Sequence, residues 1–327
     1  MGRALVLALG LAACLAAQEP TFRTGISIVE IDAQVFDKAG IIDGLKQGDF
    51  AVTDDHQLVS LRYCIQEETP LDLLFLIELS KIMAPNRLQL RGAAEAAIAA
   101  MREGDRVGVL SFNECTQIEA PLTEDLKEVR RHVRTGLAYA AFAGKPFVLP
   151  AVAGAAKYLA AGSETHGRRA ILMFGANAGF GLSNQNHIGV AKDLWNTDTI
   201  LSAVVIPTSW TRFIYDDNPY HIFGLMALAK INRFDYVDDI AEQTGGETIY
   251  TEDAGPIRAG PNPYVTLQQA IQRMRRRYRL YYDMPEAKPG QRRRVEIELT
   301  PAAQRLHPGA RIVGRKGYVV PKRAAAL

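Results

Sequence analysis

The segment 71–79 constrains the fold of this 327-residue chain more than any other, because it is apolar throughout except for Asp72 and Glu78. A run of this length and composition is typical of a strand that is buried on both faces of a parallel sheet. Downstream of it, segments with strand character alternate with segments of helical periodicity. This order predicts an α/β fold in which a doubly wound, mostly parallel sheet is covered by helices.

The ends of the expected elements are marked by changes of hydrophobic periodicity and by Gly, Pro and Asp. Glu103-Gly104-Asp105 closes one helix, and Gly245-Gly246 closes another. We expect strands at 71–79, 106–112, 117–122, 169–174, 200–206 and 247–251, and helices at 87–101, from Asp125 onward, and at 148–160, 187–195, 236–243 and 267–276.

The two flanks of this α/β region have β character. Residues 26–35 largely alternate between apolar and polar side chains, and later segments are bounded by Gly and Pro turns. Strands are expected at 26–35, 50–53 and 58–65 before the α/β region, and at 278–282, 294–299 and 311–320 after it. The N-terminal set has too few strands to be stable alone.

The first residues predict export of the chain. Met1, Gly2 and Arg3 precede an apolar run at 4–13 that is too short to span a bilayer but is typical of a signal peptide. Residues 11–14 also spell a lipobox, after which Cys14 would be acylated and would anchor the protein to a membrane; cleavage after Ala17 is the alternative. The expected location is therefore the periplasm, the outer membrane or the medium.

Two further features concern the cysteines and the charges. If Cys14 is lipidated or removed, Cys64 and Cys115 remain, and they either form one disulfide or stay two separate buried thiols. The net charge of +2 argues against general binding to nucleic acid. We interpret the basic run 273–279 as the polar face and end of the last helix, and the run 292–294 as a hairpin turn.

Several spaced motifs together resemble a von Willebrand factor A domain. They are the segments 71–80, 103–107, 169–172 and 241–246. The flanks are similar to the acidobacterial von Willebrand factor A-related family that carries an Ig-like portion, on the residues 32–35, Gly44-Leu45, Asp49-Phe50 and 315–318. The resemblance implies a signal peptide at 1–17, a von Willebrand factor A-like domain at 69–276, and an Ig-like β-sandwich built from 18–68 and 277–327.

The resemblance also implies where a metal-ion-dependent adhesion site would lie. The family uses Asp-x-Ser-x-Ser after the first strand, a Thr from a second loop and an Asp after a later strand. The corresponding positions here hold Glu78, Ser80, Ile82, Pro146 and Ala176, or Asn177 in place of Ala176 if the register shifts by one. Mg²⁺ requires oxygen ligands, which Ile, Pro and Ala side chains lack, and the extra methylene of Glu78 displaces its carboxylate.

We therefore expect no cofactor and a degenerate metal site, with Glu78 instead forming a salt bridge to Lys81 or Lys145. A Mg²⁺-dependent adhesion domain with atypical ligands is the first alternative. Catalysis is not expected, because the chain has no Gly-x-Ser-x-Gly, P-loop or His-Glu-x-x-His motif. The nearest pair, Ser163 and His166, lies in a polar connection, and a periplasmic hydrolase with an unrecognised site is the second alternative.

An aromatic segment is the candidate for partner recognition. It follows a core strand, at the side of a doubly wound sheet where ligands bind, although its rings could equally pack the loop onto the domain. Its candidate contact residues are Trp210, Arg212, Phe213, Tyr215 and Tyr220. The sequence as a whole predicts an exported, non-catalytic protein-interaction or adhesion module with an unknown protein partner.

Overall fold

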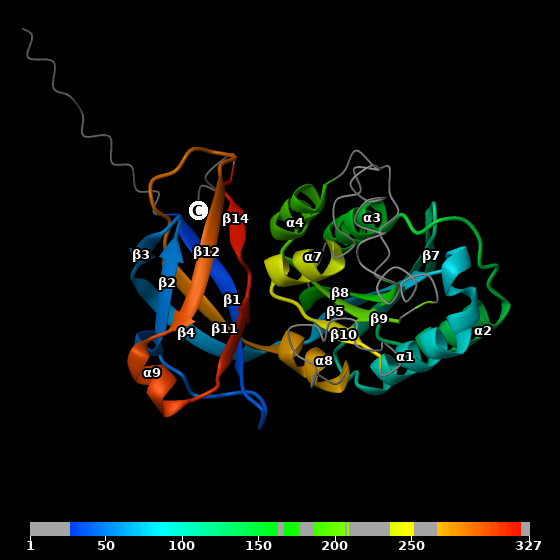
Figure 1. Ribbon diagram of the computed structural model, residues 1–327, viewed down its shortest axis with the longest axis horizontal. Helices are drawn as coiled ribbons and strands as arrows, with labels where there is room; N and C mark the ends of the chain where they lie inside the picture. Colours follow the sequence, from blue (N-terminus) through cyan, green and yellow to red (C-terminus); the bar gives the residue numbers. More distant parts are fainter. Residues whose placement is uncertain are drawn as a thin grey trace, which may run out of the picture.

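The computed structural model describes residues 27–162, 167–176, 186–206, 208, 236–251 and 267–321. Its strands form one six-stranded sheet and two four-stranded sheets. Figure 1 shows the two four-stranded sheets in one half of the molecule, and the six-stranded sheet with its helices in the other half. The predicted signal peptide, Cys14 and the aromatic segment with Trp210 lie outside the described residues.

The six-stranded sheet confirms the predicted α/β architecture. Its strand order is β10-β9-β8-β5-β6-β7, and every neighbouring pair is parallel except β6 and β7. The strands are β5 (Leu71–Glu78), β6 (Arg106–Phe112), β7 (Thr116–Thr123), β8 (Arg168–Gly175), β9 (Thr199–Val205) and β10 (Thr248–Tyr250). Every residue of β5 is buried, as its apolar composition predicts for a central strand.

Helices cover both faces of this sheet and form two separate cores. Alternate β5 side chains point to opposite faces, so Phe75 belongs to one core and Leu76 to the other. The first face is covered by α1 (Arg87–Ala99), α2 (Leu126–Tyr139) and α8 (Leu267–Arg275), and the second by α3 (Val148–Ala161), α4 (His187–Asn196) and α7 (Tyr236–Thr244). Over the described ranges, no helix is long and apolar enough to cross a bilayer.

The flanks pair with each other into two antiparallel sheets around a third core. The sheet β13-β1-β11-β4 faces the sheet β14-β12-β2-β3, and each combines N-terminal with C-terminal strands. The strands are β1 (Ile28–Phe36), β2 (Phe50–Asp54), β3 (Gln57–Val59), β4 (Leu61–Glu68), β11 (Arg276–Asp283), β12 (Arg292–Leu299), β13 (Arg311–Gly314) and β14 (Gly317–Val319). Because neither flank has a complete sheet, each depends on the other for its pairing.

Three elements of this half differ from the prediction. The expected strand 58–65 is two strands, because β3 pairs with β2 while β4 pairs with β11 in the opposite sheet. The expected strand 311–320 is likewise divided between the sheets as β13 and β14. A short helix that was not predicted, α9 (Pro301–Leu306), follows β12, and the Thr300 hydroxyl caps its first turn.

The basic run 292–294 is not a hairpin turn, because it forms the start of β12. Its central residue, Arg293, is buried and donates to the carboxylate of Asp54, with 2.5 Å between Nε and Oδ1. The hydroxyls of Tyr282 and Tyr318 donate to the other oxygen of Asp54 at 3.0 and 2.9 Å. Burial of the charge is tolerated because Asp54 and Arg293 neutralise each other and are hydrogen-bonded.

The chain passes between the two halves at one narrow junction. It enters the α/β half after β4 and leaves it where α8 runs directly into β11, and the Thr69 amide donates to the Arg275 carbonyl at 3.0 Å. The carboxylate of Asp105 accepts from the Leu71 amide at 2.9 Å and from Arg275 Nη2 at 2.5 Å. Asp105 therefore holds the entering and the leaving segments together.

The basic run 273–279 spans the end of α8, as predicted, and the start of β11, but it does not form a solvated face. Arg273, Arg275 and Arg277 are all buried. Arg273 pairs with Glu247 at 2.6 Å, while Arg277 donates to the carbonyls of Gly245 and Val313. Because Gly245 lies in the α/β half and Val313 in the sandwich, Arg277 joins the two halves.

A second charged contact reinforces this junction. Asp32 of β1 accepts from Arg168 of β8 at 3.1 Å, and the Nε of Arg277 lies 3.7 Å from the same oxygen. Burial alone would raise the pKa of Asp32, but Arg168 and Arg277 outweigh it, so the pKa lies below its usual value. The indole of Trp195 in α4 also packs beneath Arg292, with the guanidinium carbon 5.4 Å from the ring centre.

The two cysteines within the described residues are both free thiols. Cys64 lies in β4 of the sandwich and is half-buried, with its pKa raised to about 11 by burial. Cys115 is exposed between β6 and β7. The disulfide considered from the sequence is therefore absent, and the alternative of two buried thiols is wrong for Cys115.

Replacing the residue that caps α2 should weaken the fold measurably. The carboxylate of Asp125 accepts from the amides of Lys127 and Glu128, both at 3.0 Å, which satisfies two free donors of the first turn. Asp125→Ala is expected to lower the free energy of unfolding by ~1 kcal/mol in urea denaturation. The neighbouring exposed residue provides the control, since Glu124→Ala removes a carboxylate without removing the cap; equal losses would contradict the prediction.

Candidate functional site

The predicted adhesion site maps to the edge of the sheet where β5 and β8 end. Glu78 is the last residue of β5, and its side chain is fully buried. One carboxylate oxygen accepts a short hydrogen bond from the Ser80 hydroxyl, and the other accepts from the Ala176 amide at 2.8 Å. Glu78 thus links the end of β5 to the segment that follows β8.

The carboxylate of Glu78 is in an unusual electrostatic environment. Burial raises its pKa to about 7, although the hydrogen bonds from Ser80 and Ala176 act in the opposite direction. The expected salt bridge is wrong, because Lys81 and Lys145 are exposed and both oxygens of Glu78 are occupied by other donors. Within the described part of the chain, Glu78 therefore has hydrogen-bond donors but no cationic partner.

The surrounding backbone closes around this carboxylate. A Cβ added to Gly175 would overlap the Glu78 carboxylate, so the absence of a side chain there allows the close approach. The amide of Lys81 donates to the Gly144 carbonyl at 3.1 Å, and the Ala143 amide donates to Leu79 at 3.0 Å. These bonds hold the loop before α3 against the end of β5.

The described residues at this edge offer few ligands to a divalent cation. Glu78 has both oxygens engaged by the chain itself, and Ile82, Pro146 and Ala176 have no side-chain oxygen. Pro146 and Ala176 are buried, and Ile82 packs against the hydrophobic core. No group of three or more His, Cys, Asp or Glu side chains suited to a metal occurs among the described residues.

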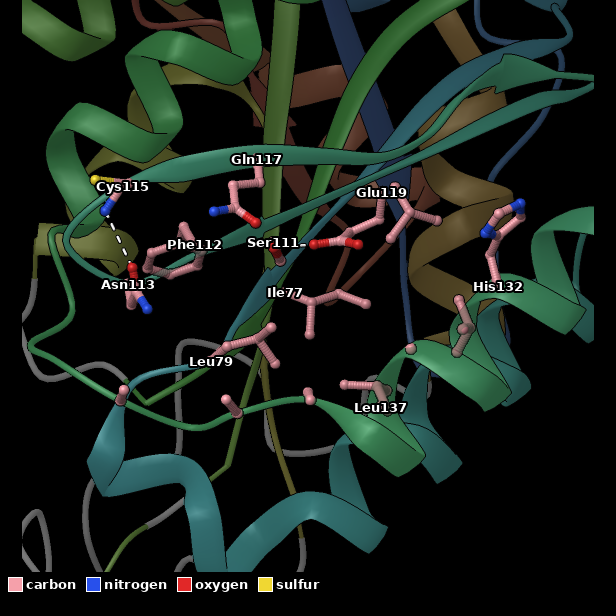
Figure 2. Close-up of a pocket in the computed structure, with 16 residues that line it drawn as sticks. Ile77, Leu79, Ser111, Phe112, Asn113, Cys115, Gln117, Glu119, His132 and Leu137 are labelled. Atoms are coloured by element: carbon pink, nitrogen blue, oxygen red, sulfur yellow. Dashed lines mark hydrogen bonds between the residues drawn. The ribbon is translucent and has the colours of Figure 1, made fainter.

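A pocket of about 380 Å³ lies beside this edge, between α2 and the hairpin of β6 and β7 (Figure 2). Its apolar wall includes Ile77, Leu79, Val133 and Leu137. Its polar wall comes from the hairpin, where the Ser111 hydroxyl donates to the Glu119 carboxylate at 2.5 Å. Figure 2 shows this carboxylate beside Ser111, with Leu137 on the α2 side and His132 at one end.

This pocket was not among the features predicted from the sequence. Two signals for it were nonetheless present. Gln117 and Glu119 are alternate residues of β7, the edge strand that pairs only with β6. The small residues Gly136, Ala140 and Ala141 leave space at and just after the end of α2. Alternate residues of a strand share one face, so the two polar side chains point toward the same region. The distance between that face and α2 depends on packing that is not local in sequence.

The remaining sequence candidates are not described by the structure. Ser163, His166 and Asn177 lie outside the described residues, as do Cys14 and the proposed contact residues. Those contact residues are Trp210, Arg212, Phe213, Tyr215 and Tyr220.

Residues 73–177 match the family model described as von Willebrand factor type A domain. This segment runs from β5 to the residue after Ala176, so it includes Glu78, Ser80 and the pocket. A comparison with curated protein sequences found no match.

Solved structures with similarity to the chain include several proteins of low sequence identity. An aerotolerance-related membrane protein from Bacteroides fragilis, crystallised with multiple mutations to serine, is 13% identical, with a TM-score of 0.42, over 63% of this chain and 98% of that chain. The conserved hypothetical protein BatB from Bacteroides thetaiotaomicron has the same identity and TM-score over 63% and 96%. The VWA domain of SpRpn10 is 13% identical, with a TM-score of 0.41, over 62% and 94%.

Proposed function

We propose that the protein, whose residues 73–177 match the von Willebrand factor type A domain, is an exported, non-catalytic interaction module that binds its partner without a divalent cation. The observation that carries this proposal is the closed environment of Glu78. Its two oxygens accept from Ser80 and Ala176, and three other positions of the family's metal site have apolar side chains. A cation would have to displace both donors and would still lack ligands.

The rest of the architecture supports an interaction role. The α/β half is held to the sandwich by buried ion pairs at the junction, including Asp32 with Arg168. Such pairs favour a fixed relative orientation of the two halves, as recognition of a partner by a preformed surface requires. Export, anchoring through Cys14 and partner contact through Trp210 and its neighbours remain predictions from the sequence.

Calorimetric titration with Mg²⁺ and Mn²⁺ tests the cation independence. The purified chain is first stripped with a chelator, and the expected result is no saturable heat and no change of melting temperature with either ion. Glu78→Gln is the matched variant, because it removes the charge while keeping the shape, so it should behave as the wild type does. Stoichiometric micromolar binding that Glu78→Gln abolishes would overturn the proposal and favour cation-bridged adhesion.

Activity assays on generic ester, peptide and glycan substrates test the absence of catalysis. The expected result is no turnover above the buffer rate at any concentration of protein. Turnover that is proportional to protein concentration and survives repurification would make the chain a hydrolase.

A further inference from the structure

The pocket between α2 and the hairpin of β6 and β7 combines an apolar wall with a single carboxylate. From this arrangement we propose that it binds a primary ammonium group carried on an unbranched apolar stem. The ammonium group would pair with Glu119, and the stem would lie against Ile77 and Leu137. This ligand site goes beyond the proposed function, because cation independence at Glu78 neither requires nor excludes it.

The size and lining of the pocket support an organic ligand. A volume of about 380 Å³ lies at the lower end of the range for small-molecule sites. Ile77, Val133 and Leu137 come from the central sheet and the buried face of α2, so they form a fixed apolar surface. Ile77, Val133 and Leu137 are already buried, so the gain on binding comes from the stem itself, whose own apolar surface leaves water in proportion to the area buried.

The charge of the lining selects a cation. Glu119 is the only carboxylate among the described residues that line the pocket, and neither Lys nor Arg is among them. The Ser111 hydroxyl donates to Oε1 of Glu119, which orients the group and leaves Oε2 for a ligand. Hydrogen bonds between an ammonium group and a carboxylate are stronger than those between neutral groups.

His132 does not change this assignment. Its Nε2 lies 3.5 Å from the carboxylate of Glu128, which is one turn earlier in α2. The same nitrogen lies 3.4 Å from Nη2 of Arg131, so both of these neighbours lie on α2 and not at Glu119, and Figure 2 shows His132 at the end of the pocket beyond Glu119. The ammonium group would therefore meet Glu119 without displacing a cationic side chain.

Calorimetric titration of the full chain with n-hexylamine and n-hexanol tests the proposal. The two compounds share their stem, and Glu119 is exposed, so we expect hexylamine to bind about threefold more tightly than hexanol, because only the amine is charged. Glu119→Gln should reduce the affinity for hexylamine about threefold and leave that for hexanol unchanged. Equal affinities of the two compounds for the wild type would overturn the assignment of the charge.

A second variant tests the location. A Cβ at Gly136 meets no atom within 4 Å, so Gly136→Leu can place its side chain in the pocket without a backbone clash, and leucine also favours the helix. This variant should fold and should lose binding of both compounds. Gly92→Leu in α1 is the control, since Gly92 is exposed, has equal space and does not line the pocket. Unchanged binding by Gly136→Leu would overturn the proposal.

The same assay distinguishes two sources of the ammonium group. A free alkylamine and a lysine side chain of a protein partner share this chemistry, so capped lysine is titrated alongside hexylamine. Comparable affinities, both lost in Gly136→Leu, support recognition of lysine side chains, while binding of hexylamine alone supports a free amine. Binding of neither compound overturns the site.

Discussion

Asp105→Ala is expected to lower the free energy of unfolding by ~4 kcal/mol, which is a large part of the stability of an ordinary domain. The carboxylate of Asp105 is buried and accepts from Arg275 Nη2, the Leu71 amide and the Arg102 amide. The other nitrogens of the Arg275 guanidinium group, Nε and Nη1, are buried without a hydrogen-bond partner in the described structure. Removing Asp105 therefore leaves an uncompensated buried charge, and urea denaturation followed by circular dichroism measures the loss.

Two further variants separate this explanation from a general effect of losing an aspartate. Asp105→Ala combined with Arg275→Met should recover much of the stability, because the unpaired guanidinium is replaced by an apolar side chain of similar length. Asp283→Ala breaks the ion pair with Arg62, in which both side chains are exposed, and should change stability little. A double variant as unstable as Asp105→Ala alone would contradict the role assigned to Arg275.

Glu78→Gln is expected to change how stability depends on pH. The pKa of Glu78 is raised in the folded protein to about 7 from an ordinary value of 4.5, so the folded state holds this proton more tightly than the unfolded state. The stabilisation that this protonation provides is complete below pH 4.5 and is lost as the pH rises through about 7. The variant cannot titrate here, so it should gain ~3 kcal/mol relative to the wild type between pH 4.5 and pH 8.

Chemical denaturation of both proteins across this pH range gives the measurement. Subtracting the free energy of unfolding of the wild type from that of the variant at each pH cancels the contributions of groups that titrate equally in both proteins. Ser80→Ala provides a further test, because the Ser80 hydroxyl lowers the pKa of Glu78, and its loss should extend the decline of stability to higher pH. Parallel stability profiles of the wild type and Glu78→Gln would show that Glu78 does not titrate in this range.

The positions of the secondary-structure elements were predictable because their signals are local. The apolar run that became β5, the Asp125 cap of α2 and the Gly245-Gly246 end of α7 each depend on neighbouring residues. The strand division at 59–61 was not predictable, because the chain there changes from one sheet to the other without a break in β character, whereas Gly314 and Gly317 flank the division between β13 and β14. Pairing with a distant strand decides such a change.

The candidate site was only partly predictable. The resemblance identified Glu78, Ser80 and Ala176 as one edge of the sheet, and the structure brings them together. A lysine partner for Glu78 was wrongly predicted, because proximity in sequence does not show that Glu78 points inward while Lys81 is exposed. The hydrogen bond from the Ala176 amide depends on the parallel pairing of β5 with β8 across 98 residues of chain.

The order of residue types alone is enough to predict the alternation of strands and helices, the central position of β5 and the apolar side chains at the family's metal positions. These properties follow from residue type and short-range periodicity. The burial of four arginines depends on long-range packing, since a run of arginines is solvated unless distant carboxylates and carbonyls surround it; they are Arg273, Arg275, Arg277 and Arg293. The pocket beside Glu119 also belongs to the tertiary structure, because its space depends on the distance at which α2 packs against the sheet.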